Sequence, residues 1–252
     1  MRNWVRSSVA VLAMATAVSG AQAFDITDMT VEERLAFRDE IRSYLFDNPE
    51  VLMEAVEIYN QKMEVAQAAS EQDLIAAYST ALFESPSDTV FGNPDGDVVL
   101  VEFSDYRCGY CKKAHPDMKA LLKDDGNIKL IIKEFPILGE ASVLASQFAI
   151  ALRDVAGEDA YRGFHDALME SKGEVTLGSL TRLAKDFDVD TDAVKARMDS
   201  DEVNAVIAGN HQLGGILQIN GTPSFVMDDR FLRGYVPYDV MRELIGDYRL
   251  NR

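Results

Sequence analysis

The alternation of apolar and polar positions divides the chain into a helical first part and a mixed second part. Residues 24–82 carry apolar residues at helical spacing and almost no strand pattern. Thr30 and Glu33 have the spacing of a capping box, which predicts a helix over about Val31–Phe46. Asn48-Pro49 then predicts the start of a second helix, with asparagine as its N-cap and proline at its first position.

The second predicted helix has an apolar seam with spacings typical of a coiled coil. Its members are separated by 4, 3, 4 and 3 positions: Leu52, Val56, Tyr59, Met63 and Ala66. The seam spans about two heptads, so the pattern fits either a short self-association surface or an amphipathic helix lying on its own domain. The pattern itself leaves both interpretations open.

A change of pattern marks the beginning of a second domain, which we place at residues 98–252. Residues 83–97, FESPSDTVFGNPDGD, contain two prolines and two glycines, which predicts a linker or loop. Val98–Phe103 and Ile128–Phe135 then have the composition of buried strands, and the segment between them, from Cys108 to about Asp124, is helical in pattern. A strand–helix–strand unit implies a parallel pair of strands with a crossover helix.

The remaining pattern is a helical block followed by a hairpin and a last helix. The hairpin is predicted from Ser224–Met227 and Arg230–Tyr235, and the last helix from Tyr238–Tyr248. The fold class is therefore α/β, with strand–helix–strand and strand–strand–helix halves separated by a helical insertion over about 140–217. The insertion's predicted helices are Ala141–Ala156, Ala160–Ser171, Leu177–Phe187 and a broken Thr191–Leu217.

The first 23 residues have the pattern of a secretory signal peptide. Arg2 and Arg6 precede an apolar run from Val9 to Val18, and Ala21-Gln22-Ala23 forms a small-x-small end. The run is too short for an ordinary membrane span, although an uncleaved anchor or a buried helix is the alternative. We expect cleavage after Ala23, secretion, and no membrane insertion of the mature chain.

The negative net charge of the chain disfavours some classes of binding partner. The formal net charge is −17, and removal of residues 1–23 leaves 23 basic and 42 acidic residues, a net charge of −19. Such a chain does not favour nucleic acid or anionic lipid.

The only cysteines are Cys108 and Cys111, which excludes a disulfide-dense scaffold. Cys108 opens a predicted helix after a strand, where free amides and the helix dipole favour a thiolate and lower the thiol pKa. Arg107, Lys112 and Lys113 add positive charge nearby. Cys111, one turn further, is expected to be more buried and less acidic. This spacing is typical of a redox dithiol, whose outer thiolate attacks a disulfide and whose inner thiol resolves the product.

Other uses of the two cysteines carry less support. A structural disulfide would close a very short loop, and a zinc site needs four ligands. His115, His165 and His211 have no spacing that suggests a second ligand pair or a base beside Cys108, which disfavours an acyl-transfer nucleophile. We expect His115 to be a partly exposed helix residue. Copper(I), a soft ion that suits sulfur, stays open as a ligand of Cys108 and Cys111.

Several further residues lie at informative spacings from the two cysteines in the sequence. Glu102 lies six positions before Cys108, Pro116 five after Cys111, and Gly221-Thr222-Pro223 precedes a late strand. With this order of elements, residues 90–250 resemble the thioredoxin superfamily, and the large insertion resembles its DsbA-like branch. The segments that carry the resemblance are FSDYRCGYC, KEFPILG and INGTPSFVM.

The resemblance implies a role for each matching residue. Cys108 is then the nucleophile, Cys111 the resolving thiol, and Gly109-Tyr110 the active-site dipeptide. Thr222-Pro223 is expected to be a loop with a cis peptide bond packed against the sulfurs, where the missing proline N–H leaves backbone groups free for a substrate strand. Glu102 matches a buried acid that moves protons to or from Cys111, the alternative being a strand residue facing water.

The first helical part has its own resemblance. The segment IRSYLFDNPEVLMEAVEIYNQK is similar to the N-terminal module of the suppressor-of-copper-sensitivity C (ScsC) proteins, within a match over about residues 30–80. In those proteins similar helices join protomers, in some members as trimers. The resemblance therefore favours a homo-oligomer, a trimer or a dimer, with residues 24–82 as its oligomerisation module.

Together these patterns predict thiol–disulfide exchange on protein substrates in the periplasm. An oligomer favours a disulfide isomerase or reductase that a membrane partner keeps reduced. The alternatives are a monomeric DsbA-like oxidase with a membrane oxidase as partner, and a copper(I)-binding protein. We expect no cofactor beyond the redox-active Cys108–Cys111 pair. The direction of electron flow depends on small energies, since about 30 mV corresponds to about 1.4 kcal/mol.

Overall fold

A computed structural model describes residues 26–251 of the chain. The chain divides into two units, one up to Gln61 and one from Lys62 onward. The division falls inside a helix, well before the predicted 83–97 boundary. The predicted signal peptide, residues 1–23, lies outside the described residues. Within residues 26–251, none of the helices combines the length and the apolar composition that a membrane crossing requires.

The first unit contains a 3₁₀ turn, Ile26–Asp28, the helix α1, Val31–Asp47, and the start of α2, Glu50–Ala77. The predicted capping box is confirmed: Glu33 N–H donates to Thr30 Oγ1 at 3.2 Å, and Thr30 N–H donates to Glu33 Oε2 at 2.9 Å. Asn48 has a different role from the predicted N-cap. Its backbone N–H and its side-chain amide both donate to the Tyr44 carbonyl, so Asn48 closes α1.

The predicted seam of α2 is an exposed apolar surface. Leu52, Val56, Tyr59 and Met63 each leave more than half of their surface in contact with solvent. Grouped exposed apolar side chains are typical of a surface that binds another chain.

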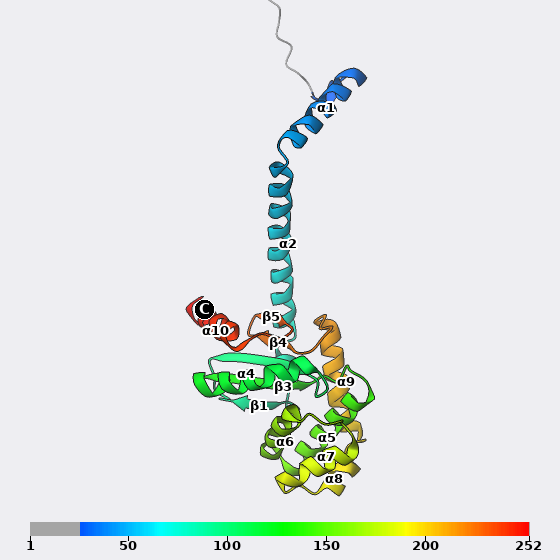
Figure 1. The fold of residues 1–252 in the computed structure, drawn as a ribbon, viewed down its shortest axis with the longest axis vertical. Helices are drawn as coiled ribbons and strands as arrows, with labels where there is room; N and C mark the ends of the chain where they lie inside the picture. The colour runs from blue at the N-terminus through cyan, green and yellow to red at the C-terminus, as the bar shows by residue number, and fades with distance from the viewer. Residues whose placement is uncertain (1–25, 252) are drawn as a thin grey trace, which may run out of the picture. The chain divides into compact units, whose positions relative to one another are not determined.

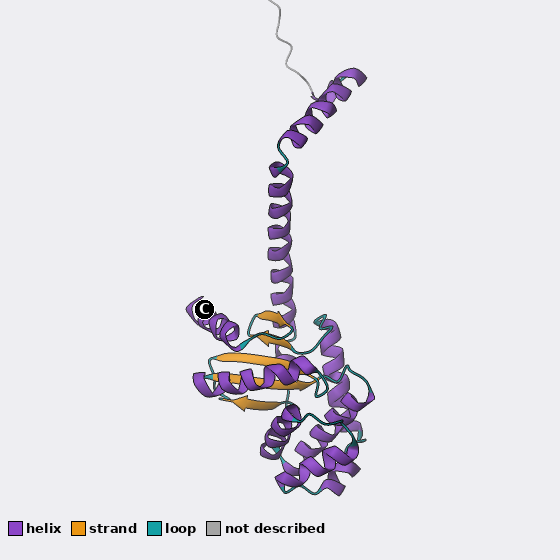
Figure 2. Ribbon diagram, viewed as in Figure 1, coloured by secondary structure: helices purple, strands orange, loops and turns teal. Residues whose placement is uncertain are grey.

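Within the described residues, five strands form one sheet in the order β1-β3-β2-β4-β5 (Figure 2). The parallel pair is β2 and β3, as predicted, and the other neighbours are antiparallel. The bounds of the strands are β1 Thr89–Gly92, β2 Val98–Ser104, β3 Ile128–Glu134, β4 Ser224–Met227 and β5 Arg230–Arg233.

Strand β1 corrects part of the linker prediction for residues 83–97. It pairs with β3 at the edge of the sheet, from Thr89 opposite Ile132 to Gly92 opposite Lys129. Four residues between prolines and glycines give too short a pattern to predict a strand, and it is the pairing with β3 that fixes their conformation.

Alternation along β2 assigns its side chains to two layers of the core. Leu100 packs with Met118 and Leu121 on one face, which helices α4 (Gly109–Asp125) and α10 (Tyr238–Asn251) cover. Val101 and Phe103 pack on the other face with side chains from the end of α2, from α3 (Ser79–Phe83) and from α9 (Asp201–Ile216). Glu102 shares the parity of Leu100 and therefore belongs to the α4 face.

The predicted insertion is a group of helices beside the β1 edge of the sheet (Figure 1). The predicted break in its last segment occurs at 198–200, where Ser200 caps α9 by accepting from Val203 N–H at 3.3 Å. The core of this group includes Phe148 and Phe164, and both cysteines belong to the same apolar cluster. Its other helices are α5 Glu140–Ala156, α6 Glu158–Glu170, α7 Leu177–Ala184 with the 3₁₀ turn Lys185–Phe187, and α8 Thr191–Arg197.

Two glycines with positive φ allow a test of the packing at the β1 edge. Gly92 has φ +74°, and a Cβ there would lie 2.5 Å from the Ile128 carbonyl oxygen, whereas Gly126 has φ +69° and open space around it. We expect Gly126→Ala to lower the free energy of unfolding by about 1–2 kcal/mol through backbone conformation alone. Gly92→Ala should cost about 1–3 kcal/mol more through the clash. Equal losses in urea denaturation would contradict the packing at β1.

Candidate active site

Cys108 is the N-cap of α4, directly after the loop that follows β2. Its backbone is extended, with φ −72° and ψ 116°, and its sulfur accepts a hydrogen bond from Cys111 N–H at 3.3 Å. The strand–loop–helix placement predicted for this cysteine is therefore confirmed. A sulfur at this position receives the helix amides that have no partner within the helix.

The loop before Cys108 is held by Asp105, a residue that the sequence analysis missed. Asp105 is fully buried. One carboxylate oxygen accepts from Arg107 N–H and from Ser142 Oγ–H, both at 2.8 Å. The other accepts from the backbone of Ile137 and Leu138 at 2.8 and 3.1 Å. One side chain thus joins the Cys108 loop to the loop after β3 and to α5.

The environment of Cys108 favours its thiolate and lowers its pKa to about 5. The largest cause is a hydrogen bond from the Cys111 side chain, and burial acts in the opposite direction. Smaller contributions that also lower the pKa come from the Thr222 side chain and from the N–H groups of Cys111 and Tyr110. The contact in which Cys108 Sγ–H donates to the Thr222 carbonyl at 3.1 Å belongs to the protonated form.

The basic residues near Cys108 act differently from the prediction. Arg107 donates to the Leu138 carbonyl at 3.0 Å, and Lys112 Nζ donates to the Ser171 carbonyl at 2.6 Å. Lys113 lies over the Tyr235 ring, 4.3 Å from its centroid. The pKa of Cys108 is therefore lowered by local hydrogen bonds, and these cations are directed elsewhere.

The two thiols, both free in the structure, differ in access and acidity. Cys108 is less exposed than predicted, with 6% of its surface accessible, and Cys111 has none. Burial raises the pKa of Cys111, and its hydrogen bond to Cys108 and the charge of Glu102 raise it further. The prediction that Cys111 is the more buried and less acidic thiol is confirmed. Between them, Gly109 is unobstructed and Tyr110 is 63% exposed.

The fold brings Thr222 and Pro223 to the dithiol from more than 100 positions away. Their peptide bond is cis, as predicted, and the Thr222 carbonyl contacts Cys108. The loop is fixed by Ser224 Oγ–H, which donates to the Gly221 carbonyl at 2.7 Å, and by Gly234 N–H, which donates to the Pro223 carbonyl at 3.0 Å.

Glu102 is a buried acid on the side of the sheet that faces α4, with 4% of its surface exposed. Burial raises the pKa of Glu102 to about 7, and the charge of Cys108 raises it further. The Ser104 side chain offsets part of this rise, although Ser104 Oγ lies outside ordinary hydrogen-bond geometry. The alternative of a strand residue facing water is wrong. A carboxyl with this pKa exchanges protons near neutral pH, and its charge acts on Cys111.

A second buried acid, Glu134 at the end of β3, was also missed. Tyr106 and Tyr161 hydroxyls donate to its Oε1 at 2.7 and 2.6 Å, and Ser146 donates to Oε2 at 2.7 Å. Burial raises the pKa of Glu134 to about 7. Tyr106, two positions before Cys108, is fixed by this acid. The available signal was an acid at the end of an apolar strand; Glu102 is likewise an acid in an apolar strand, although it lies inside β2 opposite Ile132.

The three histidines lie in packed surroundings. His165 is buried beside Tyr106, its Nδ1 2.9 Å from the tyrosine hydroxyl, and burial lowers its pKa to about 3. His115 is buried rather than partly exposed; its Nε2 lies 3.3 Å from Asp166 Oδ1, without hydrogen-bond geometry. The ring of His211 packs on Phe135. Across residues 26–251, no three His, Cys, Asp or Glu side chains form a group arranged to hold a metal ion.

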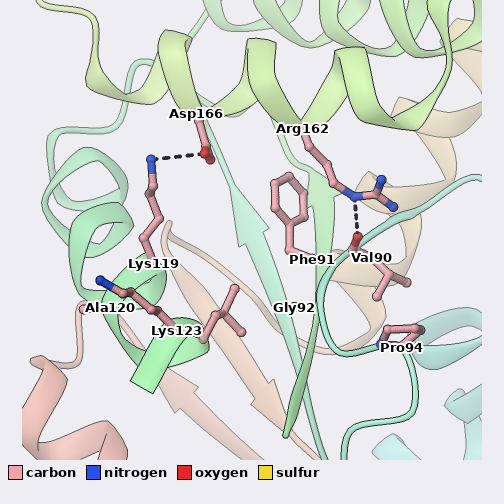
Figure 3. A pocket seen from close by; sticks show the side chains of 10 residues that line it. Val90, Phe91, Gly92, Pro94, Lys119, Ala120, Lys123, Arg162 and Asp166 are labelled. Atoms are coloured by element: carbon pink, nitrogen blue, oxygen red, sulfur yellow. Dashed lines mark hydrogen bonds and ion pairs between the residues drawn. The ribbon is translucent and has the colours of Figure 1, made fainter. Parts of the chain in front are cut away.

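A cavity of about 900 Å³ lies away from the cysteines, between α4, α6 and β1 (Figure 3). Its floor includes Val90 and Phe91. Of its basic residues, Lys119 pairs with Asp166 at 3.1 Å and Arg162 with Glu158 at 2.6 Å. No cysteine lines it, so it supplies no thiol chemistry.

Two family models match the chain. One described as thioredoxin covers residues 84–247. One described as the copper resistance protein ScsC N-terminal domain covers residues 33–66. The two matches fall on the regions that the sequence patterns separated.

Solved structures and curated proteins are similar to the same regions. A thioredoxin-like oxidoreductase from Silicibacter pomeroyi is 37% identical, covering 69% of this chain and 98% of its own, with a TM-score of 0.64. A linker-deletion mutant of ScsC from Proteus mirabilis is 27% identical, covering 89% of this chain and 98% of its own, with a TM-score of 0.66. Disulfide bond formation protein D of Bacillus subtilis is 28% identical over 168 residues, 62% of this chain and 74% of that protein.

Some matching proteins are much longer. This chain spans about a quarter of the length of two Na⁺/H⁺ antiporters from Salinispora species, which it matches at 28% and 30% identity over 61% and 57% of its own length.

The pKa of Cys108 can be measured by alkylation. We expect the rate of iodoacetamide modification of the reduced protein to follow a midpoint near pH 5, because the thiolate is the reactive form. Cys111→Ala removes the largest stabilising hydrogen bond and should move the midpoint upward. A wild-type midpoint near the free-thiol value of about 8.5 would contradict the geometry.

Glu102 gives a prediction about stability and pH. The pKa of Glu102 in the folded protein is about 7, above the ordinary 4.5, so ionisation of Glu102 lowers the free energy of unfolding. This loss of stability is absent below pH 4.5 and reaches its full size above pH 7. We expect Glu102→Gln to stabilise the protein by about 3 kcal/mol at pH 8 and by little at pH 4. The exposed Glu243→Gln on α10 is the control. A pH-independent effect in denaturant titrations would overturn the assignment.

Proposed function

This chain belongs to the thioredoxin family, and on that premise we propose that it is a thiol–disulfide oxidoreductase acting on protein substrates. One observation carries the proposal: adjacent thiols have oppositely shifted pKa values, with Cys108 acidic at the start of α4 and Cys111 protonated beneath it. Because of this difference, the Cys108 sulfur is the attacking thiolate, and the Cys111 thiol stays protonated until it resolves the mixed disulfide.

The first step uses the Cys108 thiolate. It attacks one sulfur of a substrate disulfide, a Cys108–substrate disulfide forms, and the other substrate sulfur leaves as a thiolate. With a pKa of about 5, Cys108 is ionised at neutral pH and needs no base. The side chain of Thr222 and the N–H groups of α4 stabilise the same charge when Cys108 later leaves.

The second step uses Cys111. Glu102 accepts the Cys111 proton, the resulting thiolate attacks Cys108 Sγ, and the substrate sulfur leaves. The substrate disulfide has then gained two electrons and become two thiols, and the Cys108–Cys111 dithiol has lost two electrons and become a disulfide. A carboxyl with a pKa of about 7, buried near Cys111, is suited to take and return that proton.

The direction of exchange that we propose is isomerisation or reduction in the periplasm. Support comes from the ScsC-like match at residues 33–66 and from the exposed seam of α2, which together favour a homo-oligomer, a dimer or trimer. Several thiol sites in one assembly suit the reshuffling of wrong disulfides. The signal-peptide pattern supports the location, and an exchange of this direction requires a membrane partner that returns two electrons to the dithiol.

Two other functions have support of their own. The similarity to disulfide bond formation protein D favours an oxidase, which would act on reduced substrates only. The ScsC-like module and the two soft sulfur ligands favour copper(I) binding at Cys108 and Cys111. Cys111 must lose its proton to bind the ion. Copper(I) added to the reduced protein should protect both thiols from alkylation, and unprotected thiols would remove this candidate.

Refolding of a scrambled, multi-disulfide protein tests the proposed direction. We expect the wild-type protein to restore activity to the scrambled substrate. The double variant Val56→Glu/Tyr59→Glu places charges in the seam and should lower both the mass in light scattering and the refolding yield. Reduction of a small peptide disulfide should persist, because the dithiol is unchanged.

Gln61→Glu, outside the predicted seam of α2, is the matched control and should leave mass and refolding as in the wild type. A monomeric wild-type protein that acts only on reduced substrates would show that the oxidase alternative is correct.

A further inference from the structure

Two neighbouring cavities near the dithiol have part of their lining in common, and together we call them the groove. The first, of about 640 Å³, is lined by Tyr106, Arg107, Lys112, Ala141 and the 171–175 segment that connects α6 to α7. The second, of about 400 Å³, extends along α7 to Arg182 and Asp186. They share Ser171 and residues 173–175, so the two cavities are neighbours along that segment.

The lining of the groove includes residues on both sides of Cys108 in the chain. Tyr106 and Arg107 directly precede Cys108 in the chain. Lys112 lies one helical turn after it, and Lys112 N–H donates to the Cys108 carbonyl at 3.1 Å. A polypeptide whose disulfide reaches Cys108 would therefore come close to the groove.

The groove is cationic in a strongly acidic molecule. Its four basic residues, Arg107, Lys112, Lys172 and Arg182, face two acids, Glu174 and Asp186, whereas the whole chain has a net charge of −17. Local excess charge of one sign in a cleft concentrates ligands of the opposite sign.

Acidic side chains do not neutralise these cations. Arg107 and Lys112 donate to backbone carbonyls, and Lys172 and Arg182 are exposed with no ion pair to any described residue. The cavity of Figure 3 differs in part, because two of its three basic residues, Lys119 and Arg162, are paired with acids, and only Lys123 has no ion pair to a described residue.

We propose that this groove receives an acidic segment of the protein substrate, adjacent to the disulfide that Cys108 attacks. The inference rests on the proposed exchange activity and adds a substrate preference to it. Lys172 and Arg182 are its specificity-determining residues, since their charges are free to pair with substrate carboxylates. Two neighbouring cavities along one segment suit an extended chain rather than a single small anion.

Two synthetic peptide disulfides of equal length test the preference, one with glutamates and one with lysines flanking the cysteine. We expect the wild-type protein to reduce the acidic peptide about three- to tenfold faster at low salt. The ratio should fall toward one at high salt, because exposed charges are screened. Lys172→Glu and Arg182→Glu should each remove or reverse the ratio.

Lys113→Glu is the control, because this exposed lysine of α4 makes the same change of charge but lies outside the groove. It should keep the wild-type ratio. If the wild-type protein and all variants reduce both peptides with the same ratio of rates, the proposed role of the groove is wrong, while the proposed exchange activity stands. Failure of the wild-type protein to reduce either peptide would overturn the proposed function and this inference together. A Cys108 alkylation profile unchanged in each variant excludes an indirect effect on the thiol.

Discussion

The chemistry of this protein depends on hydrogen bonds to one sulfur atom. Cys108 accepts from Cys111 and from the first amides of α4, so its negative charge is stabilised before any substrate arrives. Cys111, a single turn further, is buried near the acid Glu102, and a hydrogen bond with the Asp105 backbone offsets only part of the rise in its pKa. Two identical side chains differ in acidity because one caps a helix and the other lies inside it.

The rest of the fold keeps that sulfur in place from three directions. Asp105 fixes the loop before Cys108 by accepting four hydrogen bonds that reach α5 and the loop after β3. The cis Thr222–Pro223 loop closes the site from the second half of the sheet. The helical insertion encloses both cysteines in its own apolar core and supplies Tyr161 and Ser146 to Glu134.

Two surfaces serve neither the core nor the dithiol directly. The seam of α2 exposes apolar side chains at coiled-coil spacing, and the groove beside Cys108 carries unpaired cations in an acidic molecule. Both expose groups whose most favourable partners, apolar surface and carboxylates, would come from another chain. The first suits a copy of the same helix, and the second a substrate segment, so the proposed assembly and the proposed substrate preference would use surfaces separate from the exchange chemistry.

The sequence by itself determined the order of elements from β2 onward, the capping box at the start of α1, the parallel β2–β3 pair and the dithiol at a helix start, because each follows from spacing along a few residues. It could not place Asp105 and Glu134 in buried networks or reveal β1 inside a predicted linker. Nor could it show that local hydrogen bonds, the one from the Cys111 side chain first, rather than the neighbouring basic residues lower the pKa of Cys108. The buried networks need distant partners: Tyr161 lies 27 positions from Glu134, and Leu138 lies 33 positions from Asp105. Strand β1 likewise needs Ile132 of β3 opposite Thr89. Burial and hydrogen bonding between distant segments exist only once the chain has folded, so tertiary structure alone decided them.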